Sequence, residues 1–176
     1  MNTQLAEYLK EKSGQDILAC YQCKKCTAGC PVAPFVDITP NEIHRYILYN
    51  KKMELLQSSE IWLCTGCETC GKRCPNEINT GKVNDALKQL AMKEKIHSKE
   101  RRVSTMHSVF LSGIQKRGRM HEISLIRDMR LKAGGYFKDL KLGIKMFQLG
   151  KLSLIAERVK DIREVRALFK KARELQ

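Results

Sequence analysis

The residues of this 176-residue chain best suited to chemistry are its eight cysteines, which form two copies of one motif. The first copy reads Cys20-x2-Cys23-x2-Cys26-x3-Cys30-Pro, and the second reads Cys64-x2-Cys67-x2-Cys70-x3-Cys74-Pro. Each cysteine of the second copy stands 44 residues after its counterpart. Three cysteines at three-residue steps let a looping backbone reach three corners of a cuboidal iron–sulfur cluster. The repeat therefore predicts two [4Fe–4S] clusters.

The fourth cysteine of each motif leaves this loop and is followed by Pro31 or Pro75. In two-cluster ferredoxins with the same spacing, the fourth cysteine binds the other cluster. By that rule, one cluster takes Cys20, Cys23, Cys26 and Cys74. The other cluster takes Cys64, Cys67, Cys70 and Cys30.

Other uses of these cysteines fit the pattern less well. Structural zinc is usually bound by cysteine pairs, which would leave the third cysteine of each loop surplus. Disulfides are typical of secreted chains, and this N-terminus has no apolar signal core, so we expect a cytoplasmic protein with reduced cysteines. A purely structural cluster is the stronger alternative. Paired clusters that share ligands crosswise favour electron conduction instead.

Catalytic patterns are not found elsewhere in the sequence. The four histidines, at positions 44, 97, 107 and 121, show no metal-ligand spacing, and we expect surface or helix-packing roles for them. The glycines form neither a dinucleotide-binding nor a phosphate-binding loop. We therefore predict no catalytic residue on this chain.

The elements that must position the cysteines read as helices. Thr39-Pro40-Asn41-Glu42 has an N-cap threonine, a proline in the first turn and a glutamate that completes a capping box, and its helix should end near Asn50. Thr80 is expected to cap a second helix, with an apolar face of Val83, Leu87, Leu90 and Ala91. Residues 3–18 also show amphipathic spacing. No alternating apolar pattern predicts a strand, so the expected class is all-α.

The region beyond residue 98 has a different character. Glycines at 118, 134–135, 143 and 150 divide it into short helical pieces, and it has 20 Lys and Arg against 8 Asp and Glu. Its last piece should be a helix capped by Ser153, with an apolar stripe at Ile155, Val159, Ile162, Val165 and Phe169. We therefore divide the chain into a cluster-binding domain, 1–97, and a basic helical arm for subunit docking, 98–176.

With these motifs in place, the chain resembles the C subunit of heterodisulfide reductase. The resemblance is carried by CYQCKKCTAGCPVAPFVDITPNEI, IWLCTGCETCGKRCPNEI, GIQKRGRMHEISL and LGIKMFQLGKLSL, and it covers most of the chain. It implies an α-helical ferredoxin domain with two [4Fe–4S] clusters and a C-terminal helical extension. It also implies two partners from the same complex, a flavin-containing A-like subunit, which supplies electrons, and a disulfide-reducing B-like subunit.

The function expected from this resemblance is that of a non-catalytic electron-transfer subunit of an oxidoreductase complex. The alternatives are a stand-alone ferredoxin-like carrier, or the iron–sulfur subunit of another flavin-linked dehydrogenase. The basic arm also raises nucleic-acid binding, but it has few aromatic residues and no recognised binding motif, so we expect no nucleic-acid partner. No apolar run reaches the roughly 20 residues of a membrane span, although a basic face is compatible with peripheral membrane association.

Overall fold

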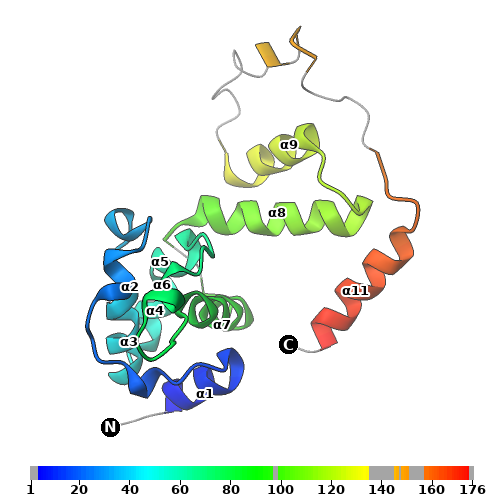
Figure 1. Ribbon diagram of the computed structural model, residues 1–176. Helices are drawn as coiled ribbons and strands as arrows, with labels where there is room; N and C mark the ends of the chain where they lie inside the picture. Colours follow the sequence, from blue (N-terminus) through cyan, green and yellow to red (C-terminus); the bar gives the residue numbers. More distant parts are fainter. Residues whose placement is uncertain (1–3, 97–98, 135–144, 147, 151–156, 175–176) are drawn as a thin grey trace. The chain divides into compact units, whose positions relative to one another are not determined.

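The computed structural model describes residues 4–96, 99–134, 145–146, 148–150 and 157–174, and every regular element among them is helical (Figure 1). The all-α expectation is confirmed for these residues. The chain splits into two compact units, residues 1–100 and 101–176, which are described separately below. Among the described residues, no helix is both long and apolar enough to cross a membrane.

The first unit contains all eight cysteines. Its α-helices are α1 (Gln4–Ser13), α2 (Lys25–Ala28), α3 (Pro40–Leu48), α4 (Lys52–Gln57), α5 (Glu60–Leu63), α6 (Thr69–Arg73) and α7 (Thr80–Lys93). Two short 3₁₀ turns, η1 (Ile17–Ala19) and η2 (Ala33–Phe35), lie in the connections.

The core of this unit is formed by apolar faces of α1, α3, α4, α5 and α7. Its largest fully buried apolar side chains are Leu9, Ile17, Ile43, Ile47, Leu55, Leu56, Ile61, Val83 and Leu87. Burying a side chain of this size stabilises the fold by about 1.5–3 kcal/mol. The long helix α7 packs against α1, α4 and α5, so it connects the two ends of the unit's sequence.

The local signals at α3 are confirmed. Thr39 and Glu42 form the predicted capping box, in which the Thr39 N–H donates to Glu42 Oε2 at 2.8 Å. The helix ends at Leu48, and Asn50 follows with a positive φ of 54°. The helix is strongly amphipathic, with Ile43 and Ile47 buried on one face.

Two predictions for the first unit need correction. The N-cap of α7 is Asn79, not Thr80, because the Asn79 Oδ1 accepts a hydrogen bond from the Gly81 N–H at 2.9 Å. The Thr80 hydroxyl is instead used in a contact with His44. The amphipathic segment at 3–18 is interrupted, since α1 ends at Ser13 and Gly14 follows with a left-handed φ of 68°.

The second unit contains α8 (Arg101–Arg117), α9 (Glu122–Ala133) and α11 (Ile162–Glu174). The predicted breaks at Gly118 and Gly134 are confirmed, and both residues have positive φ. The last helix begins at Ile162, so Val159 lies before it rather than on its stripe. Ser153 and Ile155 lie outside the described residues. Helix α8 packs against both α9 and α11.

Candidate metal centre

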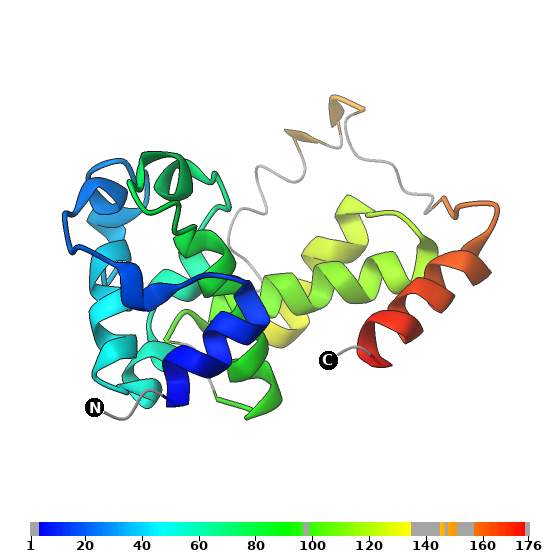
Figure 2. The same ribbon diagram turned by 60° about the horizontal axis from the view of Figure 1, so that its bottom comes forward.

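The two cysteine loops have the same backbone geometry. Gln22 and Lys24 in the first loop have φ of 58° and 62°, and Gly66 and Glu68, 44 residues later, have φ of 65° and 58°. Left-handed residues at alternate positions turn the backbone sharply, and they are rare for residues other than glycine. The short helices α2 and α6 then begin at equivalent points and lie side by side (Figure 2). The sequence repeat is therefore also a structural repeat.

A first hollow, which opens to solvent and has about 360 Å³ of empty space including that opening, lies beside the first loop. Three of its cysteines come from the first motif, and the fourth, Cys74, comes from the end of the second motif. Asn41 and His44 of α3, together with Thr80 of α7, complete its inner wall. We refer to this site as hollow 1.

A second hollow of the same volume, hollow 2, lies beside the second loop. It is lined by Cys30 from the first motif and by the first three cysteines of the second motif, Cys64, Cys67 and Cys70. Pro40, Glu60 and Asn84 also line it, and Thr80 lines both hollows. The structure thus brings together the two groups of four cysteines that the spacing rule predicts.

The N-termini of α3 and α7 lie at these hollows. Asn41 of α3 lines hollow 1 and Gly81 of α7 lines hollow 2, while Pro40 and Thr80 are the first residues of their helices. The N-terminal end of a helix carries a partial positive charge, which favours an anion. An iron–sulfur cluster with four thiolate ligands carries net negative charge, so this wall suits it.

The cysteines themselves are suited to metal binding. None forms a disulfide, and Cys23 and Cys67 are exposed at the hollows whereas the other six are half-buried. Burial raises the pKa of the Cys26 and Cys30 thiols, whereas a hydrogen bond with Thr69 lowers the pKa of Cys67. Among the described residues, no three His, Cys, Asp or Glu side chains form a site for a single metal ion. Four thiols around each hollow fit the donor set of a [4Fe–4S] cluster.

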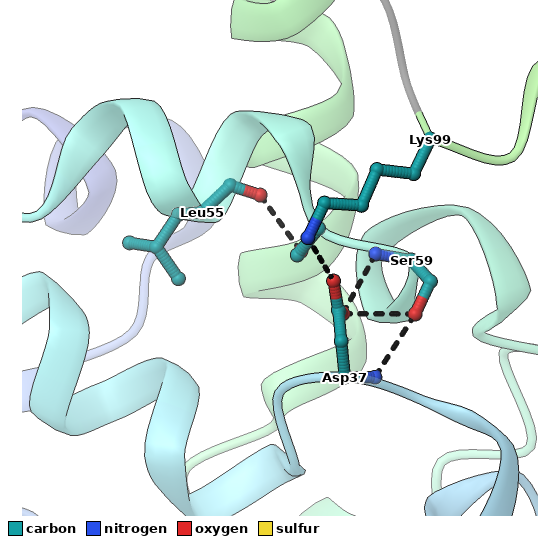
Figure 3. Close-up of polar contacts among 5 residues, drawn as sticks. Asp37, Leu55, Ser59 and Lys99 are labelled. Atoms are coloured by element: carbon teal, nitrogen blue, oxygen red, sulfur yellow. Dashed lines mark hydrogen bonds and ion pairs between the residues drawn. The ribbon is translucent and has the colours of Figure 1, made fainter.

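A polar contact joins the segment after Cys30 to the segment before Cys64 (Figure 3). The Asp37 Oδ1 accepts hydrogen bonds from the N–H and the hydroxyl of Ser59, both at 2.8 Å, and its Oδ2 pairs with the Lys99 Nζ at 2.9 Å. The Asp37 N–H in turn donates to the Ser59 Oγ at 3.0 Å. Because Ser59 directly precedes α5, this contact holds the two chain segments that supply cysteines to hollow 2.

Sequence reasoning missed the buried polar residues of the hollows. Of the two roles expected for His44, the surface role is wrong and the helix-packing role agrees with the structure, since His44 is 2% exposed and contacts Thr80 of α7. Its place in the lining of hollow 1 was not foreseen, and burial there lowers its pKa to about 4. Glu60, 1% exposed, lines hollow 2, and burial raises its pKa to about 7. Asn84 is equally buried beside it. If the sequences of α3 and α7 are aligned at their N-caps, Thr39 and Asn79, His44 and Asn84 occupy equivalent positions. This alignment is the signal that could have identified them.

Comparison with known proteins agrees with this geometry. Residues 16–78 match the family model of the 4Fe-4S dicluster domain. The chain is 39% identical over 77 residues to the C subunit of ferredoxin:CoB-CoM heterodisulfide reductase of Methanosarcina acetivorans, which is 44% of this chain and 31% of that protein. It is 32% identical over 97 residues to the iron-sulfur C subunit of CoB–CoM heterodisulfide reductase of Methanopyrus kandleri, 55% of this chain and 50% of that protein.

A third relative is the C subunit of ferredoxin:CoB-CoM heterodisulfide reductase of Methanosarcina mazei. It is 36% identical over 90 residues, which is 51% of this chain and 53% of that protein. The chain therefore spans between about a third and about half of the length of these three relatives. The resemblance noted from the sequence motifs is confirmed over about half of the chain.

Proposed function

We propose that this chain belongs to the family of heterodisulfide reductase C subunits and is the electron-transfer subunit of a heterodisulfide-reductase-type oxidoreductase. It holds two [4Fe–4S] clusters and passes electrons between a flavin-bearing partner and a disulfide-reducing partner. The chemistry of disulfide reduction then belongs to the second partner, and this chain has no active site of its own.

The observation that carries this proposal is the pair of hollows, each lined by four cysteines. The proposed ligands of the first cluster are Cys20, Cys23, Cys26 and Cys74, and those of the second are Cys64, Cys67, Cys70 and Cys30. When bound, the clusters supply one-electron redox centres. The chain contributes the thiolates, the helix N-termini that favour negative charge, and a wall shared by both sites at Thr80.

Docking on other subunits is proposed for the basic arm, residues 98–176. Among the described residues of the second unit, Val109 is the one buried apolar side chain. Large apolar side chains there are instead exposed, such as Leu131 at 61% and Leu168 at 67%. A helical unit with this little core gains stability when a partner covers its apolar surface, and its positive charge favours an acidic partner surface.

The proposed location is the cytoplasm, where reducing conditions keep cysteines available as ligands. Peripheral contact with an anionic membrane surface is compatible with the basic arm.

Crosswise ligation is tested by a matched pair of variants, Cys30→Ser and Cys74→Ser. After reconstitution with iron and sulfide, Cys30→Ser should damage the cluster of Cys64, Cys67 and Cys70 and largely spare the other, and Cys74→Ser should do the reverse. EPR spectra of the reduced proteins and iron content distinguish the two clusters. If Cys30→Ser instead damaged the cluster of Cys20, Cys23 and Cys26, and Cys74→Ser damaged the cluster of Cys64, Cys67 and Cys70, the proposed ligand sets would be refuted.

The role in a complex is tested by purification of the native protein. We expect a flavoprotein and a second iron–sulfur protein to co-purify with it, and the clusters to be reduced through the flavoprotein. A stable monomer that carries both clusters and co-purifies with no other protein would instead indicate a stand-alone carrier.

A further inference from the structure

The structural repeat extends beyond the cysteine loops into the helices that follow them. Helices α3 and α7 have their N-caps at Thr39 and Asn79, so equivalent positions of these helices are 40 residues apart. By this offset, His44 is equivalent to Asn84. Both side chains are buried, one at hollow 1 and the other at hollow 2. Each hollow therefore has one buried polar side chain from the second turn of a helix.

In hollow 1 this residue is an imidazole held by one hydrogen bond. The His44 Nε2 lies 3.0 Å from the Thr80 Oγ1, and both residues are 2% exposed. The His44 Nδ1 has no hydrogen-bond partner among the described residues. A buried polar atom without a partner costs about 1–3 kcal/mol, so a group that completes its hydrogen bonding is expected in the site.

The chemistry of the hollow determines which nitrogen carries the proton. Thiolate and sulfide sulfur atoms only accept hydrogen bonds, so an imidazole that interacts with them must present an N–H. A neutral imidazole has one N–H, and the hydrogen bond at one nitrogen sets the state of the other. When the Thr80 hydroxyl donates a hydrogen bond to the His44 Nε2, the Nε2 acts as an acceptor and carries no proton. The single N–H of the neutral ring is then at the Nδ1.

Hollow 2 lacks this arrangement. The position equivalent to Thr80 is Pro40, which has no hydroxyl and no N–H to offer. An amide hydrogen of Asn84 is donated to the Glu60 Oε1 at 3.3 Å, and the Asn84 Oδ1, which can only accept, has no partner among the described residues. The repeat places one buried polar side chain beside each hollow, His44 beside hollow 1 and Asn84 beside hollow 2. The two hollows therefore differ in the hydrogen bonding of this side chain.

We propose that His44, oriented by Thr80, donates its Nδ1–H to the cluster held by Cys20, Cys23, Cys26 and Cys74, and thereby gives that cluster the higher reduction potential of the two. A hydrogen bond to the cluster sulfurs stabilises the added negative charge of the reduced state, which raises the potential. Electrons then flow downhill from hollow 2 to hollow 1. This inference rests on the ligand sets proposed above.

The test is a redox titration of the reconstituted full-length chain, followed by EPR, with each signal assigned through Cys30→Ser and Cys74→Ser. In the wild type, the hollow 1 cluster should have the higher midpoint potential. His44→Phe keeps a planar ring but removes both nitrogens, so the potential of this cluster should fall. The hollow 2 cluster in the same molecule is the internal control and should keep its potential.

His44→Leu should give the same selective fall if phenylalanine hinders cluster assembly. Pulsed EPR of the reduced wild type with ¹⁵N-labelled histidine should also show a coupled nitrogen and an exchangeable proton. The inference is overturned if the wild-type order of potentials is reversed, if a variant with both clusters keeps its potentials, or if no such coupling is found. These outcomes differ from failure of the proposed function, in which the chain would not hold two clusters or would not pass electrons.

Discussion

Replacement of Asp37 by alanine should loosen the connection between the two chain segments that meet at hollow 2. The carboxylate accepts two hydrogen bonds from Ser59, whose side chain is buried, and pairs with the exposed Lys99. A hydrogen bond to a charged group contributes about 1.5–3 kcal/mol, and bonds that share one acceptor add less than their sum. We therefore expect Asp37→Ala to lower the free energy of unfolding by about 2–4 kcal/mol.

The matched control is Lys99→Met, which removes only the exposed ion pair. The Lys99 side chain is 64% exposed, so its contribution should be at most about 1 kcal/mol. For a unit of about 100 residues, 1 kcal/mol corresponds to roughly 4–8 °C in Tm. Thermal unfolding followed by circular dichroism should therefore separate the two variants by several degrees. Asp37→Ala should also lose iron faster than Lys99→Met, and from hollow 2 first.

The effect of Asp37 should depend on pH in a defined direction. Burial by itself raises the pKa of this carboxyl, but the hydrogen bonds from Lys99 and Ser59 outweigh burial and lower it. A lowered pKa in the folded state means that the stabilisation is complete above the unfolded value of about 3.9 and is lost as pH falls through the folded value. The difference in Tm between wild type and Asp37→Ala should shrink below pH about 4. An Asp37→Ala protein that is as stable as Lys99→Met at pH about 7 would refute the reasoning.

Three further predictions concern stability and are checked by the same thermal measurement. Leu87→Ala should cost about 2–5 kcal/mol, because Leu87 is fully buried where α7 meets its neighbours; a loss below about 1 kcal/mol would contradict this packing. Gly71→Ala should cost about 1–3 kcal/mol, since a Cβ would lie 3.0 Å from the Asn79 Cβ. Gly29→Ala should cost less, since the atoms nearest to its Cβ belong to the flexible Arg73 side chain. The reverse order would refute the comparison. Thr39→Ala should cost about 1 kcal/mol through loss of the α3 capping box, and an unchanged Tm would contradict it.

Several features could be predicted from the sequence because they depend on residues close together in the chain. The cysteine spacing identified the candidate ligands, since the ligands to three corners of one cluster come from a single loop. Thr39, Pro40 and Glu42 predicted the start of α3 because capping groups act within one turn. Gly118 and Gly134 marked helix ends for the same local reason.

Other local signals were ambiguous. Asn79 and Thr80 are both good capping residues, and only the contact between Thr80 and His44 shows why asparagine takes the cap. The apolar spacing from Val159 to Phe169 does not reveal that α11 begins at Ile162, because a coil residue can pack with the same periodicity.

The tertiary structure decided which distant residues meet. The pairing of Asp37 with Ser59 and of His44 with Thr80 joins positions 22 and 36 residues apart, and no local pattern specifies such pairs. The same holds for the surroundings of the cysteines. The sequence by itself determined which residues are candidate iron ligands and where helix α3 begins, because both follow from short-range geometry. The packing of α3 and α7 determined what lies beside each set of cysteines, since burial and hydrogen bonding in the hollows arise only when the helices come together.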